Sequence, residues 1–274
     1  MEKDFISPLL RGRKEGVEKQ MLTANELKYY SSLKHKKFRE KEGKFLIEGK
    51  HLIEECLNSF FNLEVIIVDE KQYGDKEIFA KAKENNVRIE KVKQAQINKL
   101  SETNSPPGII GVVVVKKEKT IDFSDVKLVL ALDTINDPGN LGTIIRTAYW
   151  FGVDRILIGR DSVEVYNSKV VRASQGAVFH INFSEGVDLL NELKFFRTQG
   201  FTIYALTTHT KKKLNDTQIN KQAVFLSGNE SAGLSDKFLR AGFENVKIEG
   251  YSNCESLNVG VSIGIALEKY RNSV

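Results

Sequence analysis

The stretch Leu128–Gly159 reads LVLALDTINDPGNLGTIIRTAYWFGVDRILIG, and it decides the fold. Its first six residues are apolar except for the closing Asp133, as is typical of a strand buried on both faces. A polar turn follows at Thr134–Asn140, then a predicted helix over Leu141–Phe151 and a second short buried strand over Arg155–Gly159. This is one strand–loop–helix–strand unit of an α/β fold. Ligands of such folds gather at the loop after the first strand.

The turn and the helix after it carry the pattern Asn140-x-Gly142-x-x-x-Arg146-x-Ala148. On a helix, Gly142, Arg146 and Trp150 share one face. A glycine there would let a ligand or a chain segment approach one turn below the guanidinium, and Asn140 could both cap the helix and face a ligand. An ordinary capped helix with a surface arginine is the alternative. The glycine spacing is not that of a dinucleotide fingerprint.

Composition indicates a globular protein of one large or two small domains. The chain has 274 residues, of which 41% are hydrophobic and 28% charged. No apolar run is long enough to span a membrane, and the start of the chain lacks a signal-peptide core. Two cysteines are too few for a disulfide framework, and four scattered histidines do not predict a metal site. We therefore expect a cytoplasmic protein with no membrane partner and no bound metal.

Hydrophobic patterning divides the chain into four segments. Residues 1–22 show no clear period and are expected to be a flexible leader. Strands and helices alternate over 23–115, which predicts a small α/β domain. The charged segment 116–126 is expected to be a linker, and 127–274 a second α/β domain.

The second domain continues with further alternating helices and strands. A helix is predicted over Ser168–Ala177, a strand over Phe179–Phe183 and a helix over Val187–Thr198. The closing helix, from Val259 to about Tyr270, is apolar or small nearly all round, so it should be buried. A subunit interface would explain this composition. A central helix of a monomer is the alternative.

The net charge of +5 is concentrated near the start of the first domain. Eight basic residues face three glutamates between positions 28 and 50. Such a cluster suits contact with phosphates, and the candidates are Lys34, Lys36, Lys37 and Arg39. A solvated helix end and loop is the alternative.

Three segments, each after a predicted buried strand, together resemble the motifs of the SpoU (TrmH-like) branch of the SPOUT RNA 2′-O-ribose methyltransferases. They are Asn140-x-Gly142-x-x-x-Arg146-x-Ala148, Leu226-Ser227-Gly228-Asn229-Glu230-x-x-Gly233-Leu234 and Glu255-Ser256-Leu257-Asn258-Val259. The resemblance covers about residues 127–274. Residues 23–115 resemble the substrate-binding domain found ahead of it, through Lys36-Lys37-x-Arg39, Phe45-Leu46-Ile47-Glu48-Gly49 and Pro107-Gly108-Ile109.

The resemblance implies a trefoil-knotted SPOUT domain behind a small ribosomal-protein-like α/β domain. It also implies a homodimer that methylates a ribose 2′-hydroxyl of RNA, most simply ribosomal RNA, with S-adenosylmethionine. The catalytic residues would be Arg146, Asn140, Glu230, Ser256 and Asn258. The cofactor would be held around Leu206, Thr207, Gly228, Asn229, Ile248 and Leu257. Arg146 would clamp a phosphate and stabilise developing charge, because a guanidinium is a poor base.

The third motif departs from the family pattern. It usually opens with Ile-Pro-Met and has a glycine two residues later, whereas this chain has Ile248-Glu249-Gly250-Tyr251-Ser252. The second motif has Ser231 where glycine is common. These changes affect the predicted affinity for the cofactor and the path of the loop.

Three other functions compete with this one. The same chemistry could act on transfer RNA, or the protein could hold structured RNA without modifying it. A nucleotide-dependent oxidoreductase is disfavoured, because the glycine fingerprint is missing and no acidic residue ends the second strand at Gly159-Arg160.

Overall fold

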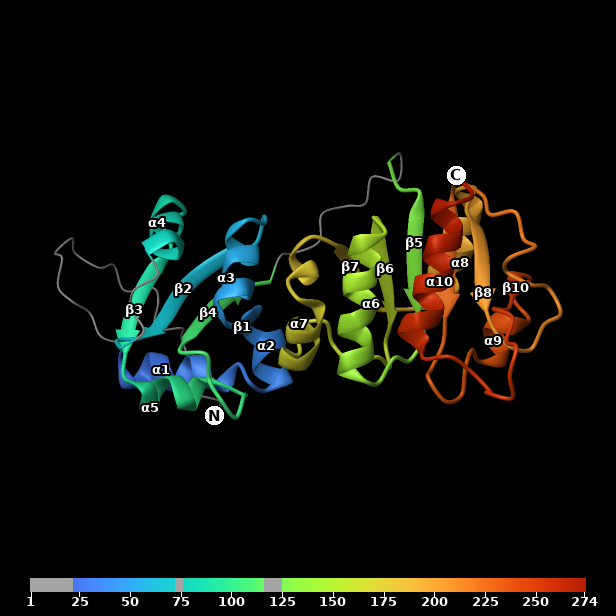
Figure 1. Ribbon diagram of the computed structural model, residues 1–274. Coiled ribbons are helices and arrows are strands. Elements are labelled where there is room, and N and C mark those ends of the chain that lie inside the picture. Colours follow the sequence, from blue (N-terminus) through green and yellow to red (C-terminus); the bar gives the residue numbers. More distant parts are fainter. Residues whose placement is uncertain (1–21, 72–75, 116–124) are drawn as a thin grey trace, which may run out of the picture.

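The computed structural model describes residues 22–71, 76–115 and 125–274, which form two sheets side by side (Figure 1). The predicted leader lies outside these residues except for Leu22, and so does the predicted linker except for residues 125 and 126. No helix in the described part of the chain combines the length and apolar character needed to cross a membrane.

The first sheet has four strands in the order β1-β4-β2-β3. Only the β2–β3 pair is parallel among its three pairings. Helices α1 and α5 cover one face, and α3 and α4 cover the other (Figure 1). The bounds are α1 Ala24–Ser32, α2 Lys36–Glu42, β1 Lys44–Glu48, α3 Lys50–Leu57, β2 Asn62–Asp69, α4 Lys76–Glu84, β3 Arg88–Val92, α5 Gln94–Leu100 and β4 Ile109–Val114.

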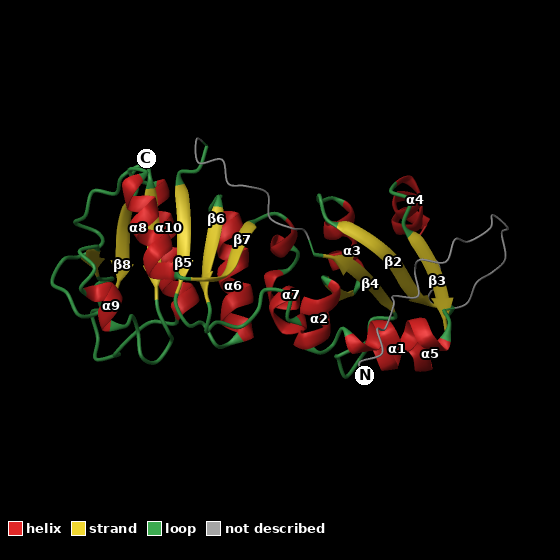
Figure 2. Ribbon diagram, turned by 180° about the vertical axis from the view of Figure 1, so that it is seen from behind, coloured by secondary structure: helices red, strands yellow, loops and turns green. Residues whose placement is uncertain are grey.

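The second sheet has six parallel strands in the order β10-β8-β9-β5-β6-β7. Helices α6 and α10 lie on one face, and α8 and α9 on the other, as the two opposite views show (Figures 1 and 2). Helix α7 packs against α6 and lies between the two sheets (Figure 1). The bounds are β5 Leu128–Leu132, α6 Pro138–Trp150, β6 Arg155–Gly159, α7 Ser168–Ser174, β7 Asn182–Val187, α8 Leu189–Thr198, β8 Thr202–Leu206, β9 Ala223–Ser227, α9 Asp236–Leu239, β10 Glu244–Val246 and α10 Val259–Arg271.

The predicted α/β class is confirmed, and β5 and β6 fully account for the two strands of the opening stretch. All five residues of each strand are buried. A parallel central strand is covered by helices on both faces, which explains why β5 is apolar without alternation.

The predicted strand over Phe179–Phe183 is present, but its predicted bounds are wrong. Residues Ala177–Phe179 form a 3₁₀ turn, and the strand begins only at Asn182. Helix α7 also ends earlier than predicted, because Gln175 adopts the left-handed conformation (φ 50°). Phe179 leaves the strand pattern because its ring stacks on Phe45 of the first sheet, with ring centroids 6.4 Å apart.

An aromatic and ionic contact region joins the two sheets, and we call it the junction. Its rings are Phe45, Phe61, Tyr166 and Phe179, with Phe45 and Tyr166 stacked at 4.5 Å between centroids. One continuous apolar core runs through it from the first sheet to the second. The first sheet is thereby packed directly against α7 and the segments beside it.

Candidate active site

Three loops meet at the carboxyl edge of the second sheet, where β5, β9 and β10 end. Strand β9 lies next to β5 on one side and β8 on the other, and β8 pairs with β10. The loops after β5, β9 and β10 carry the three predicted motifs, so the fold brings together segments that are far apart in sequence.

The loop after β5 leaves the side chain of Asn140 free of a capping role. Asp137, and not Asn140, is the N-cap of α6, and its carboxylate accepts from the backbone N–H of Asn140 at 2.7 Å. Pro138 stands at the first helical position, where its missing N–H costs nothing. The helix therefore begins earlier than predicted, and the amide of Asn140 is available for other contacts.

Three side chains form what we call the site network: Asn140, Glu230 and Asn258. Asn140 Nδ2 donates to Glu230 Oε1 at 3.1 Å, and Asn258 Nδ2 donates to Asn140 Oδ1 at 2.9 Å. One residue comes from each motif. The fold therefore brings one candidate residue of each motif together, and their catalytic roles stay a prediction.

Backbone contacts fix the orientation of every amide in the site network. Asn258 is the N-cap of α10, and its Oδ1 accepts from the N–H groups of Gly260 and Val261. Its Nδ2 must then donate to Asn140, whose own Nδ2 must donate to the carboxylate, since a carboxylate only accepts. The start of α10 therefore determines which atom donates and which accepts in each of the three side chains.

The second-motif loop is closed on itself beside the site network. Backbone hydrogen bonds pair Asn229 with Gly233 in both directions, at 3.1 and 2.9 Å. A Cβ at Gly228 would clash with the carbonyl of Gly233, so this position requires glycine. Asn229 Oδ1 accepts from the N–H groups of Ser231 and Ala232, which shows how the loop turns without a glycine at position 231.

Asn229 also reaches a strained backbone position after β5. Its Nδ2 donates to the carbonyl of Thr134 at 3.0 Å. Thr134 has φ 59°, which is unusual for a β-branched residue. Such strain concentrates at functional sites, and nothing in the sequence pattern indicated it.

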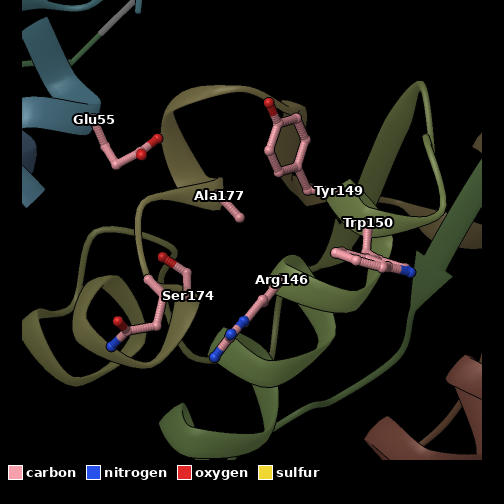
Figure 3. A pocket seen from close by; sticks show the side chains of 7 residues that line it. Glu55, Arg146, Tyr149, Trp150, Ser174 and Ala177 are labelled. Atoms are coloured by element: carbon pink, nitrogen blue, oxygen red, sulfur yellow. The ribbon is translucent and has the colours of Figure 1, made fainter. Parts of the chain in front are cut away.

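Arg146 lies on the exposed surface of α6, two turns beyond Asn140. It lines a pocket of about 360 Å³ together with Glu55, Tyr149, Trp150, Ser174, Gln175 and Ala177 (Figure 3). Gly142 does not face a ligand: a Cβ there would clash with Ala173 and with the carbonyl of Val170. The chain segment that approaches it is α7, which brings Ser174 and Gln175 beside Arg146.

The predicted cofactor residues lie at the ends of neighbouring strands. Leu206 ends β8, and the N–H of Thr207 donates to Val246 of β10 at 3.0 Å. Leu206 and Ile248 are half-buried, and Leu257 is 48% exposed. Accessible apolar side chains therefore stand beside the closed second-motif loop.

The altered third motif is anchored by charge. Glu249, at the position of the usual proline, pairs with Lys213 at 2.5 Å and accepts from the hydroxyl of Tyr251 at 3.2 Å. The hydrogen bond from Lys213 lowers the pKa of Glu249. By contrast, burial raises the pKa of Asp133 at the end of β5, against the opposing effect of Lys237.

Ser256 does not join the site network among the contacts of the described residues. It is exposed, and its carbonyl accepts from the Cys254 thiol at 3.3 Å. Its side-chain role stays a prediction.

The basic cluster is divided by the fold. Lys36 and Lys37 are exposed, and Lys36 pairs with Glu40 at 3.6 Å across one turn of α2. Lys34 is half-buried and donates to the carbonyl of Ser101 at 2.8 Å. These three stay candidates for phosphate contact.

The predicted phosphate contact of Arg39 is wrong for this conformation. Its side chain is 8% exposed and pairs with Glu164 of the other half of the chain. It also donates to the carbonyls of Leu33 and Lys34. The ion pair of Arg39 could not be predicted from the basic cluster, because its partner is 125 positions away in the sequence.

Residues that the sequence did not single out complete the surroundings of Arg146. Glu55 comes from α3 of the first sheet, and His180 follows the 3₁₀ turn. Tyr149 lies three residues after Arg146, a spacing that places it on a neighbouring face of α6. That spacing was the one available signal. The approach of Glu55 depends on the junction.

Comparisons with known proteins agree with this geometry. Residues 127–268 match the SpoU rRNA Methylase family, and residues 24–111 match the MRM3-like substrate binding domain. Over 251 residues, the chain is 30% identical to the 23S rRNA (guanosine(2553)-2′-O)-methyltransferase RlmP of Bacillus subtilis (strain 168), which covers 90% of this chain and 96% of that protein.

Solved structures extend the likeness to the whole fold. An AdoMet-bound rRNA methyltransferase from Sinorhizobium meliloti is 26% identical with a TM-score of 0.80, covering 92% of this chain and 95% of that one. An RNA 2′-O ribose methyltransferase is 25% identical with a TM-score of 0.77, covering 92% and 96%. Taken with the three motif loops at one sheet edge, these matches establish that the chain belongs to the SpoU rRNA methylase family.

Proposed function

We propose that this protein transfers the methyl group of S-adenosylmethionine to a ribose 2′-hydroxyl of ribosomal RNA. The observation that carries the proposal is the site network, which joins one residue of each motif at one sheet edge. The names of the relatives support the substrate, since the Bacillus subtilis protein is a 23S rRNA 2′-O-methyltransferase.

The residues at the strand ends fit the cofactor. Leu206, Ile248 and Leu257 offer apolar side chains on neighbouring loops, and Gly228 keeps the backbone of the second-motif loop close. When bound, the cofactor supplies a methyl group on a sulfonium. The site network would orient the ribose, because its amides are fixed before the substrate arrives.

Arg146 would bind a substrate phosphate and stabilise the charge that develops as the 2′-hydroxyl loses its proton. A guanidinium stays protonated in proteins, so it serves as a donor and not as a base. Its exposure on α6 leaves room for a phosphate. Glu230 would position Asn140, to which it is bonded.

The assembly would be a homodimer formed through α10. Val261 is 52% exposed and Leu257 48%, and Ile265 on the same helix is half-buried. Covering these side chains with a second copy would remove apolar surface from water. The backbone N–H of Lys247 donates to the carbonyl of Lys212 at 2.9 Å, and the carbonyl of Lys247 accepts from the N–H of Leu214 at 2.8 Å. These two bonds support the trefoil path implied by the family. With two free thiols, we place the protein in the cytoplasm.

The test is label transfer from methyl-labelled S-adenosylmethionine to total RNA from a strain of the source organism that lacks this protein. We expect label in large ribosomal RNA at one position that resists alkaline cleavage. The Arg146→Ala variant should lose at least about 100-fold in rate. Arg240→Ala, which replaces the exposed arginine directly after α9, is the matched control.

Label in the transfer RNA fraction would keep the chemistry and replace the substrate. Absence of label, together with absence of cofactor binding by calorimetry, would overturn the proposal in favour of a protein that holds RNA without modifying it.

A further inference from the structure

The pocket beside Arg146 is built by both halves of the chain. Glu55 reaches it from α3, whereas Arg146, Tyr149 and Trp150 project from α6 and Ser174 from α7 (Figure 3). Its volume of about 360 Å³ is large enough for a single planar base. The phosphate role proposed above concerns Arg146 and leaves the rest of this pocket without an occupant.

One wall of the pocket is aromatic and accessible. The ring of Tyr149 stacks on that of His180 at 5.0 Å between centroids and 16° between planes. Tyr149 remains 48% exposed and Trp150 85% exposed. Unstacked RNA bases are recognised by stacking on such rings, because every base has a π-face.

A carboxylate is held in a fixed position beside the Tyr149–His180 stack. Glu55 Oε2 bonds with His180 Nε2 at 2.9 Å. The Glu55 side chain also lies directly over Gly176, where a Cβ would clash with it. Gly176 has φ 88°, so its conformation and the missing side chain together make the space that Glu55 occupies. A carboxylate accepts hydrogen bonds and donates none.

The order of residues along α6 indicates the path of the RNA along this helix. Asn140 and the rest of the site network stand at the start of the helix, Arg146 follows in the middle, and Tyr149 and Trp150 stand at its end. If the ribose lies at the site network and a phosphate at Arg146, the next nucleotide of the RNA lies at Tyr149. In RNA, a phosphate separates one ribose from the next nucleotide.

We propose that this pocket binds the base of the nucleotide adjacent to the methylated one, stacked on Tyr149 and Trp150, and that Glu55 selects a base that carries an exocyclic amino group. An amino group donates to the carboxylate. Uracil has no amino group, and carbonyl oxygens flank its single imino N–H on both sides. These oxygens would be repelled by the carboxylate. This inference rests on the proposed function and adds a specificity determinant to it.

The test uses a short ribosomal RNA fragment that contains the mapped methylation site. The nucleotide on each side of that site is replaced in turn by each base and by an abasic residue. Wild-type protein should show a KM about 10-fold higher for the abasic or uracil form at one of the two positions, with kcat within about two-fold. Tyr149→Ala should raise KM similarly on the natural fragment and show no further rise on the abasic one.

Two variants separate stacking from selection. Glu55→Gln keeps the shape but adds a donor, so the discrimination against uracil should fall at least about three-fold while the abasic effect persists. Phe195→Ala, an exposed aromatic on α8 at the other face of the sheet, is the control and should leave KM unchanged. Sedimentation measures the oligomeric state of each variant. A changed oligomeric state in Trp150→Ala would mean that Trp150 contributes to the assembly and not to base binding.

The inference is overturned if abasic replacement on both sides changes kcat/KM less than two-fold, or if Tyr149→Ala has the same effect on natural and abasic RNA. Loss of label transfer by the wild-type protein on the natural fragment would instead contradict the proposed function, so the two failures are distinguishable.

Discussion

The site network and the junction both join distant parts of the chain, but they do so in opposite ways. The site network is polar and lies on loops at a sheet edge, with its amides half-buried or exposed. The junction is packed from stacked rings and holds the Arg39–Glu164 pair away from solvent. The polar groups that would meet the substrate stay accessible, whereas the groups that hold the two sheets together are shielded from water.

The pocket at Arg146 depends on the junction. Glu55 reaches the pocket at Arg146 only because the junction packs the first sheet against α7. A change in the junction should therefore alter both stability and substrate recognition, while a change in the site network should alter the chemistry alone.

The largest expected effect is on activity, in Asn140→Ala. Removing the central amide disconnects Glu230 from Asn258, so we expect kcat to fall about 100-fold or more, as for other preorganised donors. The melting temperature should stay within about 2 °C, since Asn140 is only half-buried in the first turn of α6. Asn182→Ala, an exposed asparagine at the start of β7, is the control. A variant that loses activity only by unfolding would show that the site network is structural.

In the junction, Arg39→Ala should cost a comparable free energy. This cost should lower the free energy of unfolding and not kcat. Removing the arginine leaves the Glu164 carboxylate, whose side chain is 13% exposed, without its charge partner. Breaking such a pair costs about 3 kcal/mol. Urea unfolding measures this loss. The double variant Arg39→Met with Glu164→Leu should recover most of it, and failure to recover would mean that the pair itself stabilises the junction.

The smallest expected effect is on thiol reactivity. The comparison is between Cys56 in the first α/β domain and Cys254 in the second. Burial raises the pKa of Cys56 to about 12, so its thiolate is scarce at neutral pH. Cys254 is exposed on the third-motif loop. We expect one thiol to react with Ellman's reagent in the native protein and the second only after denaturation. S-adenosylmethionine should slow the first at least about three-fold, because bound ligand covers the loop. Equal reactivity of both thiols would contradict the packing around Cys56.

The sequence was sufficient for the edge of the sheet that carries the site network. Asn140, Glu230 and Asn258 each follow a short buried strand, and parallel strands place such positions at one edge. The bounds of β6 were predicted fully and those of β5 to within one residue, since continuous apolar runs between breakers leave little freedom.

The junction was not predictable in this way, because its residues follow patterns that tertiary contacts override. Phe179 and Phe183 alternate as in a strand, yet Phe179 turns toward Phe45. Arg39 lies among lysines and was assigned to the basic surface, yet it pairs with Glu164. The close approach expected at Gly142 is made by a chain segment, α7, which is one of the two alternatives that the sequence left open. Each misassignment involves a partner on a distant segment.

The most direct test of the site network is a double-mutant cycle between Asn140→Ala and Asn258→Asp on kcat. Aspartate keeps the cap of α10 but cannot donate to Asn140, so the helix is preserved while the network is broken. We predict that Asn258→Asp costs about 100-fold in the wild-type background but less than about three-fold when Asn140 is already alanine. Equal losses in both backgrounds would show that the two residues act independently, and would contradict a network assembled from the three motifs.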